Sequence, residues 1–180
     1  SKFVNQLEKE FIGGQPQKAM PLFLADLPNI RLAWEWAVEN HDASVFNDMS
    51  DSVMQGFDLA GLYGEALQMA EHAAGSLEPL PKSAKRETVI ARGKVMGLAG
   101  AFLFRLGEYG QAMEKCEASM QTLEKYRPHI AYAHTLVYAG AAQFGLRDMN
   151  AALQFWEKAI QEYHAAGSLW GETTSRNNLA

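Results

Sequence analysis

Histidine, cysteine and clustered carboxylates are the side chains of this sequence that could do chemistry, and their spacing argues against a catalytic or metal site. His129 and His134, two of the five histidines, are five positions apart and so do not share one helical face as two metal ligands would. The single cysteine, Cys116, excludes an internal disulfide and a CxxC site. We expect His129 at a helix start, His134 on a helix face and Cys116 in the core.

Three carboxylates follow one another at helical spacing. Asp48, Asp51 and Asp58 lie near one face of a helix over NDMSDSVMQGFDL, because spacings of three and seven return to the same side. Acid–base chemistry would need a pocket, so a solvated helix face is the favoured interpretation, and an acidic patch that docks a basic peptide is the alternative. HExxH, GxSxG and GxGxxG motifs are absent, and Gly93-Lys94 lacks the earlier glycine of a P-loop. We therefore expect no enzymatic activity, no cofactor and no metal.

The composition is that of a folded chain with a small acidic excess. The 180 residues suffice for one domain, and 16 basic against 21 acidic residues give a net charge of −5. This balance argues against direct binding of nucleic acid, whose phosphates need a basic surface. The uncharged stretch 128–146 has nearly the length of a membrane span, but its proline, two histidines and glutamine argue against one. The charged residues at positions 8–10 exclude a signal peptide. We expect a cytoplasmic protein without membrane association.

Helical periodicity dominates the chain, and we expect nine or ten helices and no sheet. The segment PNIRLAWEWAVEN is predicted to begin a helix at Pro28, because proline is tolerated in a first turn. Ile30, Trp34 and Ala37 then share one face, whereas Trp36 points the other way. Either both tryptophans are covered, or one of them meets a neighbour outside the chain.

Two segments align when shifted by 40 residues, GLAGAFLFRLGEYGQAMEKCEASM and TLVYAGAAQFGLRDMNAALQFWEKAI. The shift aligns small residues with small residues, Gly100 with Gly140 and Ala112 with Ala152. It also aligns two residues predicted to lie in the core, Cys116 and Trp156. A glycine on the first helix lets the second helix approach closely. Such hairpins cannot bury both faces alone, so we expect them to stack into a solenoid.

This pattern resembles the tetratricopeptide repeat through Gly100, Gly107, Tyr109 and Ala112, although the period is 40 rather than 34 residues. The resemblance implies an all-α fold, a right-handed α-α superhelix of antiparallel helix hairpins. The paired prolines of SLEPLPKS, 76–83, mark the clearest loop. The expected division is N-terminal helices over 1–43 and repeats over 44–180, with units at about 44–77, 84–126 and 128–166 and a truncated unit at 168–180.

The N-terminal segment is similar to the junction that follows the nucleotide-binding module in bacterial STAND-type signalling ATPases and related transcriptional activators. The residues that carry this similarity are Asp26, Asn29, Arg31, Ala33 and Trp36-Ala37. It implies a non-catalytic protein-interaction or sensor scaffold, a fragment of a larger signalling or transcription-regulatory protein. The alternative is a domain of such a regulator that senses a small-molecule metabolite.

The tetratricopeptide resemblance also implies a concave groove lined by the first helix of each hairpin, which binds a peptide segment or a partner domain. Mixed apolar and basic side chains would suit an extended peptide with acidic groups. Self-association through the C-terminal helix, whose apolar side includes Leu179, is a further expectation. The groove residues carried over from the resemblance are Lys94, Phe104, Arg105, His134, Val137, Phe144 and Asn177.

Overall fold

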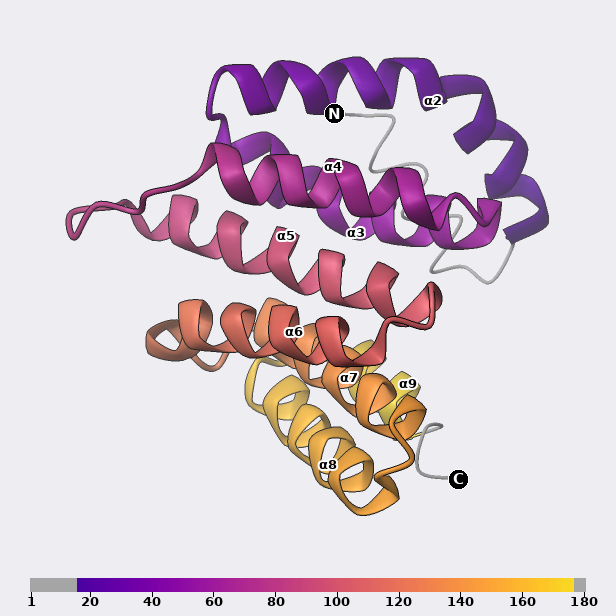
Figure 1. Ribbon diagram of the computed structural model, residues 1–180, viewed down its shortest axis with the longest axis vertical. Helices are drawn as coiled ribbons and strands as arrows, with labels where there is room; N and C mark the ends of the chain where they lie inside the picture. Colours follow the sequence, from indigo (N-terminus) through magenta and orange to yellow (C-terminus); the bar gives the residue numbers. More distant parts are fainter. Residues whose placement is uncertain (1–15, 177–180) are drawn as a thin grey trace.

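The computed structural model describes residues 16–176, and this part of the chain is built from α-helices (Figure 1). No strand occurs within it, so the prediction of an all-α chain is confirmed there. The eight helices are α2 (Pro16–Glu39), α3 (Ala43–Ala60), α4 (Tyr63–Ser76), α5 (Arg86–Arg105), α6 (Tyr109–Leu123), α7 (Ile130–Gly145), α8 (Met149–Ala165) and α9 (Leu169–Arg176), with a 3-10 turn at Glu124–Tyr126.

Five of the connections between consecutive helices share one turn geometry. In each turn a residue adopts left-handed backbone angles, and the next backbone N–H reaches back to a carbonyl five positions earlier, which satisfies a helix-end carbonyl. Glycine occupies three of these positions, because it adopts a positive φ without strain. The left-handed residues are His41, Gly61, Gly107, Arg147 and Gly167, and the bonds run from Asp42 to Ala37, Leu62 to Phe57, Glu108 to Leu103, Asp148 to Gln143 and Ser168 to Tyr163.

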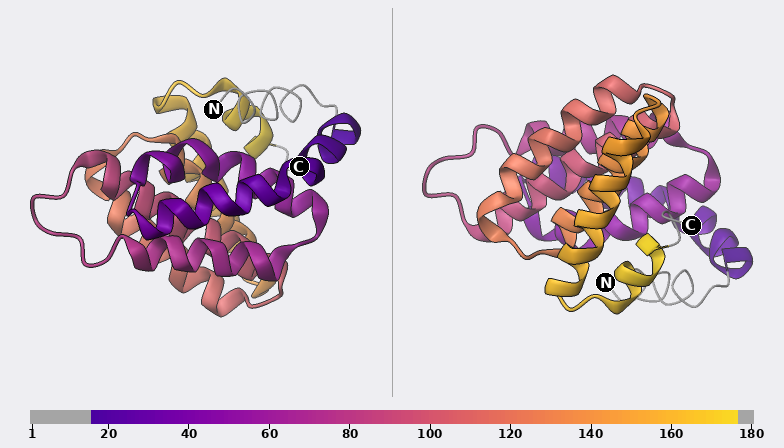
Figure 2. Two further views of the ribbon diagram at one scale, coloured as in Figure 1. Left: turned by 90° about the horizontal axis from the view of Figure 1, so that it is seen from above. Right: turned by 90° about the horizontal axis from the view of Figure 1, so that it is seen from below.

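Helices contact each other most extensively within the pairs α5–α6 and α7–α8, and two further kinds of contact join successive pairs. The first helices α3, α5 and α7 touch one another in succession, and each second helix touches the first helix of the next pair, α4 against α5, α6 against α7 and α8 against α9. The loop 77–85 projects at one end of the molecule, beside the start of α5 (Figures 1 and 2). Helix α5 is thereby covered by α3, α4, α6 and α7.

Helix α2 is longer than the sequence predicts. It begins at Pro16 and continues through Pro21 and Pro28, so the prediction that Pro28 starts the helix is wrong. Both prolines lie on the exposed side, while the buried stripe continues past them without interruption. Burial of that stripe against α3 and α4 outweighs the backbone hydrogen bonds that proline removes. The stripe consists of Phe23, Leu27, Ile30, Trp34 and Ala37.

Close approach of paired helices depends on glycine facing a larger side chain. A Cβ added at Gly100 would lie 2.7 Å from Cys116 Sγ, and one added at Gly140 would lie 2.3 Å from Trp156 Nε1. Ala112 and its sequence equivalent are fully buried beside these contacts. The two hairpins therefore use equivalent positions for the same packing, as the 40-residue shift predicts. Within residues 16–176 we find no helix with the length and apolarity needed to cross a bilayer.

Candidate functional site

Helices α3, α5 and α7 together present one surface, which we call the α3–α5–α7 face. Side chains from all three helices meet there around a cavity of about 20 Å³, room for roughly one water molecule. The polar and aromatic residues that define this face are Asp51, Asp58, Lys94, Arg105, His134 and Tyr138.

Asp51 is the centre of this face, because two cationic or titratable groups from different helices converge on it. Lys94 Nζ lies 3.5 Å from one carboxylate oxygen and donates a hydrogen bond of 2.8 Å to the Asn47 carbonyl. His134 Nδ1 lies 3.5 Å from the other oxygen. One carboxylate of α3 thus connects α5 and α7, and the charge of Lys94 is largely balanced within the chain.

The imidazole of His134 is enclosed by aromatic rings. The Tyr163 ring packs edge-on against it at 5.6 Å, and the Tyr138 ring lies at 6.5 Å. Burial lowers the pKa of His134 and Lys94 lowers it further, whereas Asp51 opposes the change. Burial also raises the pKa of both tyrosines. The ring is therefore set up to remain neutral near pH 7.

Arg105 is paired in the same manner further along α5. Its Nε and one terminal nitrogen donate to the two oxygens of Asp58 at 2.5 and 2.7 Å, a fork-to-fork pair. This hydrogen bonding is the main cause that raises the pKa of Arg105. Asp51 and Asp58, which the sequence suggested as part of a solvated face or a free acidic patch, instead join α3 to α5, whereas Asp48 is exposed as predicted.

The predicted apolar groove residues occupy different surroundings. Phe104 is partly buried and contacts the Tyr109 ring at 5.8 Å, so it fills the corner between α5 and α6. Val137 packs into the core between α7 and α8. Phe144, near the end of α7, is 52 % exposed, and its ring centre lies 6.2 Å from that of Trp156.

The predicted residues thus divide into two groups. The α3–α5–α7 face brings together Lys94, Arg105 and His134. Phe104 lies beside Arg105, whose guanidinium is 5.7 Å from the Phe104 ring centre, whereas Val137 and Phe144 pack toward α8. Asn177 and Leu179 lie outside the described residues. Leu169, at the start of α9, is 78 % exposed.

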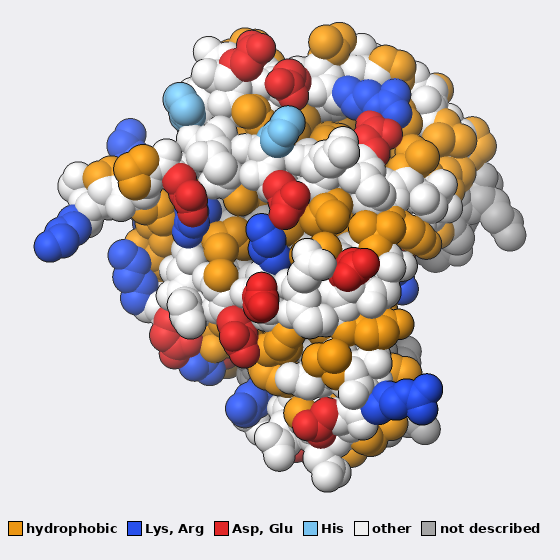
Figure 3. Space-filling view, in the orientation of Figure 1, with side chains coloured by type: hydrophobic (Ala, Val, Ile, Leu, Met, Phe, Trp, Pro, Cys, Tyr) orange, Lys and Arg blue, Asp and Glu red, His pale blue; other side chains and the backbone are white. Residues whose placement is uncertain are grey.

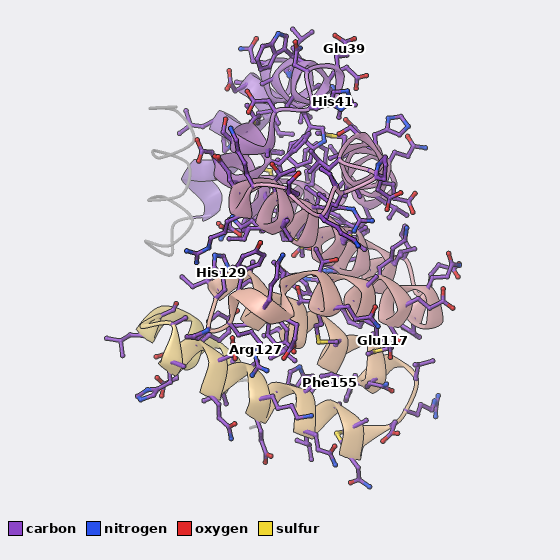
Figure 4. All side chains as sticks on the ribbon, turned by 90° about the vertical axis from the view of Figure 1, so that its left-hand side faces the viewer. Glu39, His41, Glu117, Arg127, His129 and Phe155 are labelled. Carbon is purple, nitrogen blue, oxygen red and sulfur yellow. The ribbon has the colours of Figure 1, made fainter. Side chains whose placement is uncertain are left out.

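A second hollow of about 430 Å³ adjoins the first at the N-terminal ends of α5 and α7 and shares Lys94 with it. Figure 4 views this side of the molecule face on, with His129 and Arg127 labelled. His129 caps α7, because its Nδ1 accepts a hydrogen bond of 3.1 Å from the Ala131 amide, as the sequence predicts for a helix start. We call this hollow the α5 cleft; Asn47, Arg86, Glu87, Ile90, Lys94 and His129 line it.

The surface that carries α4, α6 and α8 differs in character. Figure 3 shows acidic and basic side chains interspersed there, with hydrophobic side chains toward the right-hand edge. Glu71 pairs with Lys115 at 3.0 Å and Glu78 pairs with Arg92. These pairs border a hollow of about 190 Å³ in which cation and carboxylate balance each other. The balance leaves this hollow without a net charge for a ligand.

The arrangement does not offer a reactive nucleophile at Cys116. The thiol is fully buried, and burial raises its pKa to about 12, which keeps it protonated at neutral pH. Within residues 16–176, no cluster of three or more His, Cys, Asp or Glu side chains could hold a metal ion.

Sequence reasoning did not assign several residues to this site. Tyr138 and Arg86 carried no signal beyond their helical position. Asp51 and Asp58 lie two helical turns apart on α3, and the cations that they face, Lys94 and Arg105, lie three turns apart on α5. Two acidic residues on one helix and two basic residues on another were a signal from which these ion pairs could have been predicted.

No protein-family model matches the chain, and a comparison with curated proteins gives no significant match. The proposals below therefore depend on the contacts, burial and charges of the α3–α5–α7 face and the α5 cleft, together with the repeat pattern of the sequence.

Proposed function

We propose that the protein is a non-catalytic interaction scaffold, a right-handed superhelix of tetratricopeptide-like hairpins that holds a segment of a partner protein against the α3–α5–α7 face. The observation that carries this proposal is the succession of contacts between first helices, which places polar and aromatic side chains, several of them partly exposed, on one continuous surface. The turns of common geometry and the glycine-mediated packing of equivalent positions support the repeat.

The wider role follows from the resemblance of the N-terminal segment. Asn29 donates to Asp26 at 2.6 Å, and Arg31 pairs with Glu65 of α4 at 2.5 Å. The first contact lies within α2, and the second ties the motif of α2 to the following hairpin. We therefore propose that α2 links the scaffold to a further module of a cytoplasmic bacterial signalling or transcription-regulatory protein.

Site-specific photo-cross-linking tests the docking face. A photoreactive phenylalanine analogue at Tyr138 should cross-link to one defined segment of a partner in cells, identified by mass spectrometry. The matched control places the same analogue at Gln154, an exposed position of α8. Equal cross-linking from the two positions, or none from Tyr138, would contradict docking on the α3–α5–α7 face.

A second candidate function is sensing of a small-molecule metabolite, and the α5 cleft favours it. Its volume of about 430 Å³ lies within the range of small-molecule sites. A ligand at 100 times its dissociation constant stabilises the folded protein by about 2.7 kcal/mol, which thermal-shift screening of metabolites detects readily. No shift across sugars, nucleotides and amino acids would exclude this function.

A further inference from the structure

The α5 cleft has an apolar middle and polar ends. Arg86, Ile90 and Lys94 follow at intervals of four along α5 and so line its floor on one helical face. The two cationic residues are separated by about 12 Å along the helix, at 1.5 Å per residue. His129 reaches the cleft from the start of α7, and Asn47 from α3. Three helices therefore fix the positions of its polar groups.

The two cations of this cleft differ in how far carboxylates among the described residues balance their charge. Within residues 16–176, Arg86 makes no ion pair; its guanidinium lies 5.7 Å from the Tyr126 ring centre. Lys94 shares Asp51 with His134. Arg105, by contrast, is fully occupied by Asp58. Arg86 thus supplies a cation without an ion pair in the described part of the chain at one end of the cleft, where the Glu87 carboxylate also lines the rim.

His129 adds a neutral donor beside these cations. Because its Nδ1 accepts from the Ala131 amide, the ring proton is on Nε2, which remains able to donate. Burial lowers the pKa of His129, and Lys94 and Arg86 lower it further, with Asp51 as the weaker opposing influence. An anion next to this ring would meet Arg86 and Lys94, while the Glu87 carboxylate at the rim and Asp51 behind Lys94 oppose it.

Asn47 supplies a polar atom that nothing in the described residues satisfies. Its Nδ2 donates to the Glu87 carbonyl at 3.1 Å, whereas its buried Oδ1 has no hydrogen-bond partner. Buried acceptors are nearly always paired, so this oxygen calls for a donor such as a hydroxyl group. A ligand of the cleft would therefore carry a hydroxyl or amine as well as negative charge.

We propose that the α5 cleft binds a small phosphate monoester with hydroxyl groups, of the sugar-phosphate class. The phosphate lies against His129 Nε2–H between Arg86 and Lys94, and a ligand hydroxyl donates to Asn47 Oδ1. This assignment rests on the second, small-molecule function proposed above. It names the ligand class for that function, and it does not depend on a partner docking at Tyr138.

The geometry favours a phosphate ester over a simple carboxylate. The donors approach from the start of α7 and from two places on α5, and a tetrahedral phosphate accepts hydrogen bonds from several directions. A phosphate ester also carries between about one and a half and two negative charges at pH 7, which suits Arg86 together with a partly balanced Lys94. The positive charge is localised at one end of the face, which fits one compact anion better than an extended acidic peptide.

Calorimetric titration with ribose 5-phosphate tests the proposal, with inorganic phosphate and ribose as separate arms. The variants are Arg86→Gln and its matched control Lys85→Gln, which removes the same charge from an exposed neighbour outside the cleft. Glu87→Gln removes the carboxylate at the rim. Thermal melts without ligand establish that each variant is folded.

We expect saturable binding of ribose 5-phosphate that weakens about tenfold in Arg86→Gln, the size of one lost charged hydrogen bond, and stays unchanged in Lys85→Gln. Glu87→Gln should bind more tightly, and ribose alone should not bind.

Equal weakening by Arg86→Gln and Lys85→Gln would overturn the site, because it would indicate unspecific charge attraction. Absence of binding by both phosphate-containing ligands would overturn the phosphate assignment. If ribose or another neutral metabolite then bound and shifted the melting temperature, the small-molecule function would stand while the ligand class proposed here would fail. Inorganic phosphate binding as tightly as ribose 5-phosphate would contradict the role of Asn47.

Discussion

At the scale of single residues, glycine positions decide how closely the helices of a pair approach. Gly100 and Gly140 are equivalent in the 40-residue shift, and each faces the bulky side chain that the shift also pairs, Cys116 and Trp156. A small residue on one helix and a larger one on the other fill the same interface with different volumes. The contact is thus kept by complementary size rather than by identical residues.

Gly140→Ala should destabilise the protein by roughly 1–3 kcal/mol, because its Cβ would lie 2.3 Å from Trp156 Nε1 in a packed interface. Denaturant unfolding measures the change. The control is Gly110→Ala in α6, where an added Cβ meets nothing within 4 Å. This control should stabilise by about 0.5–1 kcal/mol through helix propensity. Equal effects of the two substitutions would refute the packing role of Gly140.

His134 makes stability depend on pH. Since burial lowers its pKa in the folded state, the unfolded chain binds a proton near pH 6.5, where the folded chain still excludes one. The free energy of unfolding should therefore be fully retained above pH 7 and fall as the pH drops below about 6.5, with His129 acting in the same direction. Asp51 moderates the effect at His134 by stabilising the imidazolium.

Chemical unfolding at several pH values between 7 and 5 checks this expectation. His134→Gln should flatten the loss of stability on acidification, whereas His72→Gln, at an exposed position of α4, should leave the curve as it is. A pH dependence that is unchanged in His134→Gln would show that the acid sensitivity arises elsewhere.

At the scale of elements, α2 shows how a buried stripe overrides local helix-breaking signals. Trp34 donates from its indole N–H to the Met69 carbonyl at 2.8 Å and packs edge-on against Phe46. Trp36, two positions on, is 53 % exposed. The expectation that two tryptophans at this spacing cannot share one core is therefore confirmed, with Trp34 inside.

The two tryptophans provide a matched pair of substitutions. Trp34→Ala should cost about 3–5 kcal/mol, because it removes a side chain that is only 1 % exposed and leaves a cavity. Trp36→Ala should change stability by less than about 0.5 kcal/mol, as expected for a surface position. Both changes in the free energy of unfolding can be measured from the denaturant concentration at the unfolding midpoint, provided that the dependence of this free energy on denaturant stays the same. A large loss in Trp36→Ala would indicate that this face of α2 is covered in solution.

At the scale of the whole molecule, α5 is the helix on which the others depend. It contacts α3, α4, α6 and α7, and most of its residues from Val89 to Leu103 are buried. Helix α3 is joined to it by charge as well as by apolar packing, because Lys94 pairs with Asp51 and Arg105 pairs with Asp58. Loss of α5 would therefore separate the N-terminal helices from the C-terminal ones.

Hydrogen exchange should reflect this arrangement. We expect the slowest amide exchange in α5, because opening it requires breaking contacts with four helices, and the fastest in the loop 77–85. Helix α9 should exchange early, since the contacts that hold it come mainly from α8. Mass spectrometry of peptic fragments resolves these segments. Protection of α9 equal to that of α5 would contradict the ranking.

The sequence by itself determined the helical class, the glycine contacts of the hairpins and the opposite directions in which Trp34 and Trp36 point. These features are local, because helix periodicity and side-chain size are read within one or two neighbouring helices. The start of α2 could not be predicted from the sequence. Proline signals a helix start unless an apolar stripe that extends past it is buried against other helices, and that burial is visible only in the folded structure.

Only the tertiary structure decided what the charged residues do. Asp51, Lys94 and His134 follow one another at intervals of about forty residues, and each alone looks like a solvated side chain on its own helix. Stacking of α3, α5 and α7 brings them within ion-pair distance, while Arg86 is left without an acidic partner among the described residues. Electrostatic partners are set by distances of a few ångströms between helices, and no property of one helix determines those distances.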